Sequence, residues 1–139
     1  MVNKLSPDGE SQLIKREGKR NKAYKDTKGI WTIGVGHTGP HVYEGLAWTD
    51  QQIMDAFRAD IKWAEDAVNK VVTPLQQHQF DALVSFVFNI GATGFARSTC
   101  LKKLNMGLYD EAAVAMMMWV KPPELYGRRL SEHNQFLGK

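Results

Sequence analysis

The chain of 139 residues has a single cysteine, Cys100, and no long run of apolar residues. One cysteine excludes an internal disulfide and fits a protein made in a reducing cytosol. We expect Cys100 to be a small, buried, apolar side chain on a helix. No stretch approaches the roughly 20 apolar residues that span a bilayer. The opening residues 1–12 contain no apolar core and no small-residue cleavage site, so we expect neither a signal peptide nor a stable membrane anchor.

Metal-ligand spacing is also missing from the sequence. No His-Glu-x-x-His pattern and no cysteine pair accompanies the four histidines, His37, His41, His78 and His133. We therefore expect no metal site. The net charge is only +3, which suits an acidic polymer as substrate but is too small to indicate nucleic acid as a partner. Apolar residues make up 43% and charged residues 24% of the chain, a balance typical of one globular domain.

The first third of the chain changes structural type. Ser6 precedes a proline, which is the usual start signal of a helix, and that helix should end near Gly18. Residues 23–35 flank the turn 26–29 with apolar and aromatic side chains, a pattern that predicts a β-hairpin. Residues 38–48 contain glycine and proline and are predicted to form a loop.

The remaining residues are predicted to be helical. The capping-box pattern at 49–52 begins a helix that should extend to about residue 72. Thr73 followed by Pro74 predicts the start of the next helix, which is apolar nearly all round and should be the central core helix. Further helices are expected at 98–105, 109–119 and 127–136.

These elements predict an α+β, predominantly helical fold with two lobes. We expect residues 1–139 to form one domain with a small β-hairpin lobe at about 10–50, a connecting helix at about 50–72 and a helical lobe at about 73–139. A cleft between two lobes is the usual place for a site.

Two carboxylates and a hydroxyl lie close together in the sequence at the point where helix gives way to hairpin. Glu17 and Asp26 are nine positions apart, and Thr32 follows six residues later in an alternating stretch. Acetal hydrolysis needs an acid that protonates the leaving oxygen, a base that activates water and a group that holds the water. The residue types fit that chemistry, although Glu17 on a basic helix could be a surface acid and Asp26 could be the Asx residue of its turn.

This segment resembles the phage-type lysozymes or endolysins of glycoside hydrolase family 24, the family of the T-even phage lysozyme. The likeness begins with the spacing Glu17-x8-Asp26-x5-Thr32, which closes on Gly34-Val-Gly36-His37, and covers most of residues 10–136. It continues in residues 79–91, 97–105 and 127–132.

The resemblance implies a lysozyme-like two-lobed fold and a peptidoglycan N-acetylmuramidase that works without metal or cofactor. The bond that it hydrolyses would be the β-1,4 bond between N-acetylmuramic acid and N-acetylglucosamine. By that likeness Glu17 is the general acid, Asp26 activates or directs water, and Thr32 orients it.

Four further residues are candidates for binding the substrate. Phe88 is one of several aromatic rings that could stack on a sugar, and Asn89 follows it in the matched segment. His37 could bond to the hairpin or the cleft wall, or act as a second acid or a metal ligand, although no ligand spacing supports the last. Arg128, with Arg129, could be solvated or could reach a carboxylate in the cleft.

Two other functions remain open at this point. A non-catalytic wall-binding or phage structural module could keep the fold, but it would not need both Glu17 and Asp26. A lytic transglycosylase would need no base for water, so Asp26 and Thr32 favour hydrolysis.

We expect the protein to act as a monomer on peptidoglycan. It should remain in the host cytoplasm until a separate pore-forming holin opens the membrane. Lysis of the wall would then release phage.

Overall fold

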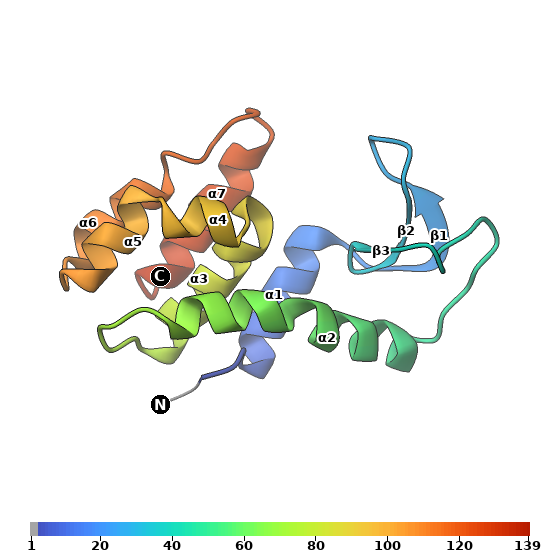
Figure 1. The fold of residues 1–139 in the computed structure, drawn as a ribbon, viewed down its shortest axis with the longest axis horizontal. Helices are drawn as coiled ribbons and strands as arrows, with labels where there is room; N and C mark the ends of the chain where they lie inside the picture. The colour runs from blue at the N-terminus through green and yellow to red at the C-terminus, as the bar shows by residue number, and fades with distance from the viewer. Residues whose placement is uncertain (1–2) are drawn as a thin grey trace. The chain divides into compact units, whose positions relative to one another are not determined.

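The computed structural model describes residues 3–139; Met1 and Val2, which also entered the expectation of no anchor, lie outside the described residues. Helices dominate and one small sheet is present, as predicted (Figure 1). The elements in chain order are α1 (Pro7–Glu17), β1 (Arg20–Lys25), β2 (Trp31–Gly34), β3 (His37–Thr38), α2 (Asp50–Asn69), α3 (Gln77–Ile90), α4 (Ala92–Ala96), α5 (Thr99–Asn105), α6 (Tyr109–Met116) and α7 (Leu125–Phe136).

The chain divides into two compact units. One unit is Ser11–Lys62, and the other combines the residues up to Glu10 with Trp63–Lys139. Both α1 and α2 therefore contribute residues to each unit. The expected single domain with lobes at about 10–50 and 73–139 stays a prediction. Across residues 3–139, no helix has both the length and the apolar character that crossing a membrane requires.

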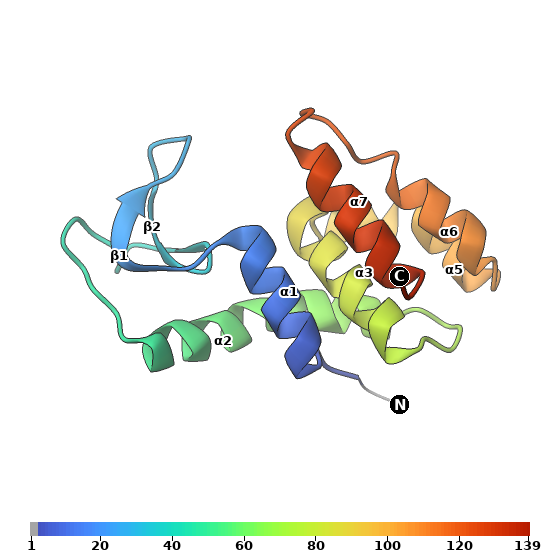
Figure 2. The same cartoon turned by 180° about the vertical axis from the view of Figure 1, so that it is seen from behind.

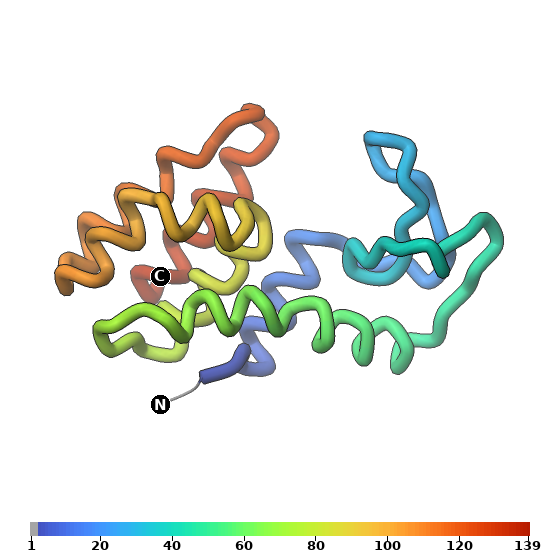
Figure 3. The backbone as a smooth tube through the Cα atoms, in the orientation of Figure 1, coloured from blue at the N-terminus to red at the C-terminus, as the bar shows by residue number. Residues whose placement is uncertain are grey.

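The sheet of the Ser11–Lys62 unit is antiparallel, in the order β1-β2-β3. Tyr24 faces Thr32 and Lys25 faces Trp31 across the hairpin, which confirms the predicted turn. The first strand begins at Arg20 rather than near residue 23, with an irregularity before Tyr24. The short strand β3 was not predicted, because two residues cannot display an alternating pattern. Figure 3 follows the chain from β3 through the predicted loop into α2.

Helix α2 begins with the predicted capping box. The Gln52 amide donates to Thr49 Oγ1 at 3.1 Å, and the Thr49 amide donates to Gln52 Oε1 at 2.8 Å. The helix ends at Asn69, a few residues before the expected position, and the Val71 amide closes a turn on Val68. The apolar residues at helical spacing are buried: Ile53, Phe57, Ile61, Ala64 and Val68.

Helix α3 is the core of the other unit, as predicted. Every residue from Phe80 to Val87 is buried. Helix α3 packs against α7 (Figure 2) and also contacts α4. The predicted start at Pro74 is wrong, because the helix begins at Gln77. A capping box between Gln76 and Gln79 fixes this start, with the Gln76 amide donating to Gln79 Oε1 at 2.8 Å.

The later helices differ from the predictions mainly at their ends. The helix predicted at 98–105 is α5, and Ser98 caps it, its hydroxyl accepting from the Leu101 amide at 3.0 Å. Helix α6 ends at Met116 rather than Trp119, because the amides that follow it form tighter turns, and α7 starts two residues early at Leu125. Helix α4 was not predicted, since five residues are too short for a periodic pattern.

Asp81 of α3 holds the start of α1. Its carboxylate accepts from the Ser6 amide at 3.1 Å, from the Ser6 hydroxyl and from Gln77 Nε2 at 2.8 Å. The Ser6 hydroxyl in turn caps α1 by accepting from the Gly9 amide at 3.0 Å. A Cβ atom on Gly9 would lie 2.5 Å from Asp81 Cγ, so the helix reaches this position only without a side chain.

Gly9→Ala is expected to lower the free energy of unfolding by about 1–3 kcal/mol, because the new methyl group overpacks against Asp81. Gly127→Ala is the matched control, since a Cβ there meets nothing within 4 Å. It should stabilise helix α7 by up to about 1 kcal/mol. Denaturant unfolding measures both values, and equal stability of the two variants would contradict the close approach of Asp81.

Cys100 is fully buried on α5, as predicted, and burial raises the pKa of its thiol to about 12. The folded protein should therefore not react with a thiol reagent such as Ellman's reagent at pH 8, whereas the urea-unfolded chain should react fully. The folded thiol keeps its proton above the unfolded pKa of about 8.5, so this residue lowers stability as pH rises beyond that value. Rapid labelling of the folded protein would show that the thiol reagent reaches Cys100 and would contradict its burial.

Candidate active site

Glu17 is the last residue of α1 and is half-buried. The Gly18 amide donates to the Ile14 carbonyl at 2.7 Å, so the helix ends where the chain turns toward β1. Gly36 lies beside the carboxylate: a Cβ on Gly36 would be 3.5 Å from Glu17 Oε1. Its φ of 71° also favours glycine. A side chain at position 36 would therefore approach the carboxylate.

Asp26 closes the turn between β1 and β2. Its Oδ1 accepts from the Lys28 amide at 2.8 Å and from the Ile30 amide at 2.9 Å, while the Gly29 amide donates to the Asp26 carbonyl at 3.0 Å. The residue is thus the Asx residue of its turn. Within residues 3–139 these bonds engage only Oδ1, so the turn fixes the carboxylate and leaves Oδ2 for another partner.

Thr32 lies on β2 and is 3% exposed. Its hydroxyl donates to the Ile30 carbonyl at 2.9 Å. A hydroxyl has one proton and two lone pairs, so Oγ1 can act here only as an acceptor toward a further group. The strand pairs Thr32 with Tyr24 on one side and with Thr38 on the other, which fixes its backbone.

The three residues belong to one compact unit, Ser11–Lys62. An acid at a helix end, a carboxylate in a rigid turn and an acceptor hydroxyl on the next strand suit proton transfer to a leaving group and to a water molecule. Among residues 3–139, no group of three or more histidine, cysteine, aspartate or glutamate side chains is placed to hold a metal ion.

His37 bonds to two side chains that the sequence did not connect with it. Its Nδ1 lies 2.6 Å from Asp60 Oδ2 of α2, and its Nε2 lies 2.7 Å from His41 Nε2. The ring also lies against Trp48, with centroids 5.3 Å apart. These bonds join β3 to α2 and join the segment after β3 to His37. A role of His37 in substrate binding stays a prediction.

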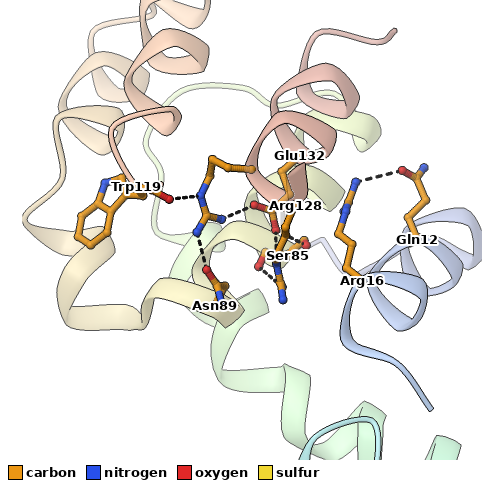
Figure 4. A network of polar contacts seen from close by, with 8 residues as sticks. Gln12, Arg16, Ser85, Asn89, Trp119, Arg128 and Glu132 are labelled. Carbon is orange, nitrogen blue, oxygen red and sulfur yellow. Dashed lines mark hydrogen bonds and ion pairs between the residues drawn. The ribbon is translucent and has the colours of Figure 1, made fainter. Parts of the chain in front are cut away.

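Arg128 and Arg129 both form ion pairs with Glu132 of their own helix, and Figure 4 shows the contact of Arg128. A contact of either arginine with a carboxylate in the cleft stays a prediction. Arg128 Nε lies 3.1 Å from Glu132 Oε2, and its Nη2 donates to the Ser85 carbonyl at 3.1 Å. Ser85 donates its hydroxyl to Glu132 as well. This buried cluster joins α7 to α3.

Asn89 takes part in the same cluster through Arg129. The guanidinium of Arg129 donates to Asn89 Oδ1, and its Nε donates to the Trp119 carbonyl at 2.8 Å. Arg129 and Glu132 are both completely buried. Burial lowers the pKa of Arg129, and the charge of Glu132 opposes that change.

Phe88 is half-buried and stacks on Trp63, with ring centroids 5.9 Å apart. The Trp63 side chain is 42% exposed, so the pair presents aromatic surface to solvent. Sugar binding by Phe88, Asn89 and Arg128 stays a prediction.

Three partners of these residues were not predicted from the sequence. Asp60 and His41 bond to His37, and Glu132 pairs with Arg128 and Arg129. Glu132 could have been found, because it stands three and four residues after the two arginines on one helix. Asp60 could not, because it is 23 residues from His37 and no local pattern links them.

Comparisons with known proteins identify the family of the chain. The sequence model of the phage lysozyme family matches residues 14–132. An endolysin of Salmonella phage P22 is 43% identical over 142 residues, which cover 96% of this chain and 97% of that protein.

Solved structures give the same result. A mutant of P22 lysozyme superposes with a TM-score of 0.89 at 42% identity and covers 97% of this chain and 99% of that one. The muramidase domain of SpmX from Asticaccaulis excentricus superposes with a TM-score of 0.87 at 40% identity, covering 97% and 98% of the two chains.

The chain belongs to the phage lysozyme family. Its α+β fold is the lysozyme fold of the phage endolysins, as the sequence predicted. It is a lysozyme-type glycosidase, a peptidoglycan-hydrolysing muramidase that lyses host cells.

Proposed function

We propose that Glu17, Asp26 and Thr32 carry the hydrolysis of the β-1,4 bond between N-acetylmuramic acid and N-acetylglucosamine. Glu17 protonates the leaving oxygen, Asp26 takes a proton from water, and Thr32 orients that water. The hydrogen bonding of Thr32 and Asp26 is the observation that carries this assignment.

The Thr32 hydroxyl proton is committed to the Ile30 carbonyl, so a water molecule can only donate to Oγ1. Asp26 Oδ1 is committed to two amides, which leaves Oδ2 to accept the second proton of the same water. A water that donates to both groups has its lone pair free for the anomeric carbon. Asp26 then receives the proton as the bond to carbon forms.

Glu17 donates a proton to the glycosidic oxygen of the leaving group, while water attacks the anomeric carbon. Gly36 adds no side chain of its own beside Oε1, which favours the approach of a glycosidic oxygen to the carboxyl group there. We also propose that Phe88 stacks on a sugar ring, and that His37, Asn89 and Arg128 contribute to the surface that holds the glycan.

Mass spectrometry of peptidoglycan digests tests this chemistry. Hydrolysis gives reducing N-acetylmuramic acid ends, whereas a transglycosylase gives 1,6-anhydro ends without using water. We expect reducing ends from the unaltered protein. Asp26→Asn keeps the Oδ1 acceptor of the turn but removes the base, so it should fold normally and lose most of the reducing ends. Predominantly anhydro ends would refute the water-activating roles of Asp26 and Thr32.

We further propose that the protein is a monomer and waits in the host cytoplasm until a separate holin opens the membrane. The endolysin relatives support a lytic role of this kind. Production of the chain alone in a Gram-negative host should leave growth unaffected until chloroform permeabilises the membrane. Prompt lysis without a permeabilising agent would contradict the need for a holin.

A further inference from the structure

Positive charge is concentrated in one short segment of the chain. Residues 15–28 hold seven of the 18 lysines and arginines and only two carboxylates, Glu17 and Asp26. This segment therefore carries a charge of +5, while the rest of the chain carries −2. The modest net charge of +3 hides this separation. A local excess of positive charge attracts an anionic partner to that part of the chain.

Four of these cations are exposed on β1 and in the turn after it, and we name this set the basic strand surface: Arg20, Lys22, Lys25 and Lys28. None of the four has an ion-pair partner anywhere in residues 3–139. Lys19, just before the strand, does pair with Asp50 at 3.2 Å. The local fold therefore leaves these charges unneutralised.

Two of the four cations lie over aromatic rings. Arg20 Cζ is 4.4 Å from the centroid of the Tyr24 ring, and Lys25 Nζ is 5.4 Å from that of Trp31. Such contacts restrict long side chains without removing their charge. The strand thus presents cations in partly fixed positions, which lowers the entropy lost when an anion binds.

We propose that the basic strand surface binds the free carboxylates of the peptide side chains of peptidoglycan. The proposal rests on peptidoglycan being the substrate. The glycan strands themselves carry no charge. The carboxylates of the attached peptides are therefore the anionic groups of a wall without other polymers. Arginine and lysine are the side chains that recognise carboxylates. Because Glu17 and Asp26 lie in the same segment, binding would hold the wall beside the residues proposed to cut it.

Co-sedimentation with purified sacculi tests the proposal. Covalently attached phosphodiester polymers are first removed with hydrofluoric acid, so that carboxylates are the remaining anions. All proteins carry Glu17→Gln to limit digestion. The test variant adds Lys22→Glu, Lys25→Glu and Lys28→Glu, and the control adds Lys70→Glu, Lys102→Glu and Lys139→Glu. Both triple changes alter the net charge equally, and all six lysines are exposed to solvent.

The test variant should bind at least about tenfold more weakly at low salt, and the control should bind within about twofold of the parent. Capping the wall carboxylates as methylamides should weaken binding of the parent to the level of the test variant, as should about 0.5 M salt, at which charges are screened within a few ångströms. Equal weakening by the two triple variants, or unchanged binding to the capped wall, would overturn the proposal.

Failure of the catalytic assignment would look different. It would show as digestion of the sacculi by the Glu17→Gln parent, which soluble muropeptides in the supernatant report. That result would leave the comparison of the two triple variants on intact sacculi at short times and low temperature unaffected.

Discussion

Replacement of Glu17 by glutamine is expected to slow peptidoglycan hydrolysis by about 10²–10⁴-fold, the usual contribution of general acid catalysis. The amide has nearly the same shape as the carboxyl group but cannot donate the proton to the leaving oxygen. Glu17 lies at the end of α1 and is only half-buried, so the free energy of unfolding should change by no more than about 0.5 kcal/mol. Loss of turbidity of outer-membrane-stripped cells measures the rate.

Glu44→Gln is the matched control. Glu44 is exposed in the segment between β3 and α2 and stands outside the proposed constellation. Its variant should clear cells at the rate of the unaltered protein. A Glu17→Gln protein that clears them nearly as fast would show that another group supplies the proton.

Arg129→Met is expected to lower the free energy of unfolding by about 3–5 kcal/mol, the cost of removing one partner of a buried ion pair. Among the described residues 3–139, the change leaves Glu132, which is completely buried, with only Arg128 and Ser85 as partners. It also removes the donors to Asn89 and to the Trp119 carbonyl. Urea unfolding followed by circular dichroism measures the loss.

Two further variants separate the ion pair from general effects of substitution. Arg97→Met changes an exposed arginine and should alter stability by no more than about 0.5 kcal/mol. Arg129→Met combined with Glu132→Leu removes both buried charges and should be more stable than Arg129→Met alone. A single Arg129→Met variant as stable as Arg97→Met would contradict the burial of this pair.

The elements predicted from the sequence are those whose signals are local. Capping residues and apolar spacing located α1 and α2 to within a few residues, because both signals act within one or two turns. The start of α3 was misplaced because two start signals follow each other. Thr73 instead donates its hydroxyl to the Leu104 carbonyl at 2.6 Å, a contact that local sequence does not reveal.

The site shows the same division between local and distant partners. Glu17, Asp26 and Thr32 could be picked out because a helix end, a turn and a strand follow each other within 16 residues. The turn bonds of Asp26 were also predictable, since an aspartate at this position accepts from amides that follow it. The contact of His37 with Asp60 depends on how the sheet packs on α2, and only the folded chain defines it.

The anomeric form of the first product tests most directly whether Asp26 acts through water. A base that activates water on the face opposite the leaving group inverts the anomeric centre, and the two carboxyl groups of such enzymes lie about 6.5–9.5 Å apart. Proton NMR during the first minutes of digestion, before mutarotation, should therefore show the α-anomer of the new N-acetylmuramic acid end. Initial formation of the β-anomer, or a trapped glycosyl-enzyme at Asp26, would contradict this role and make Asp26 the nucleophile.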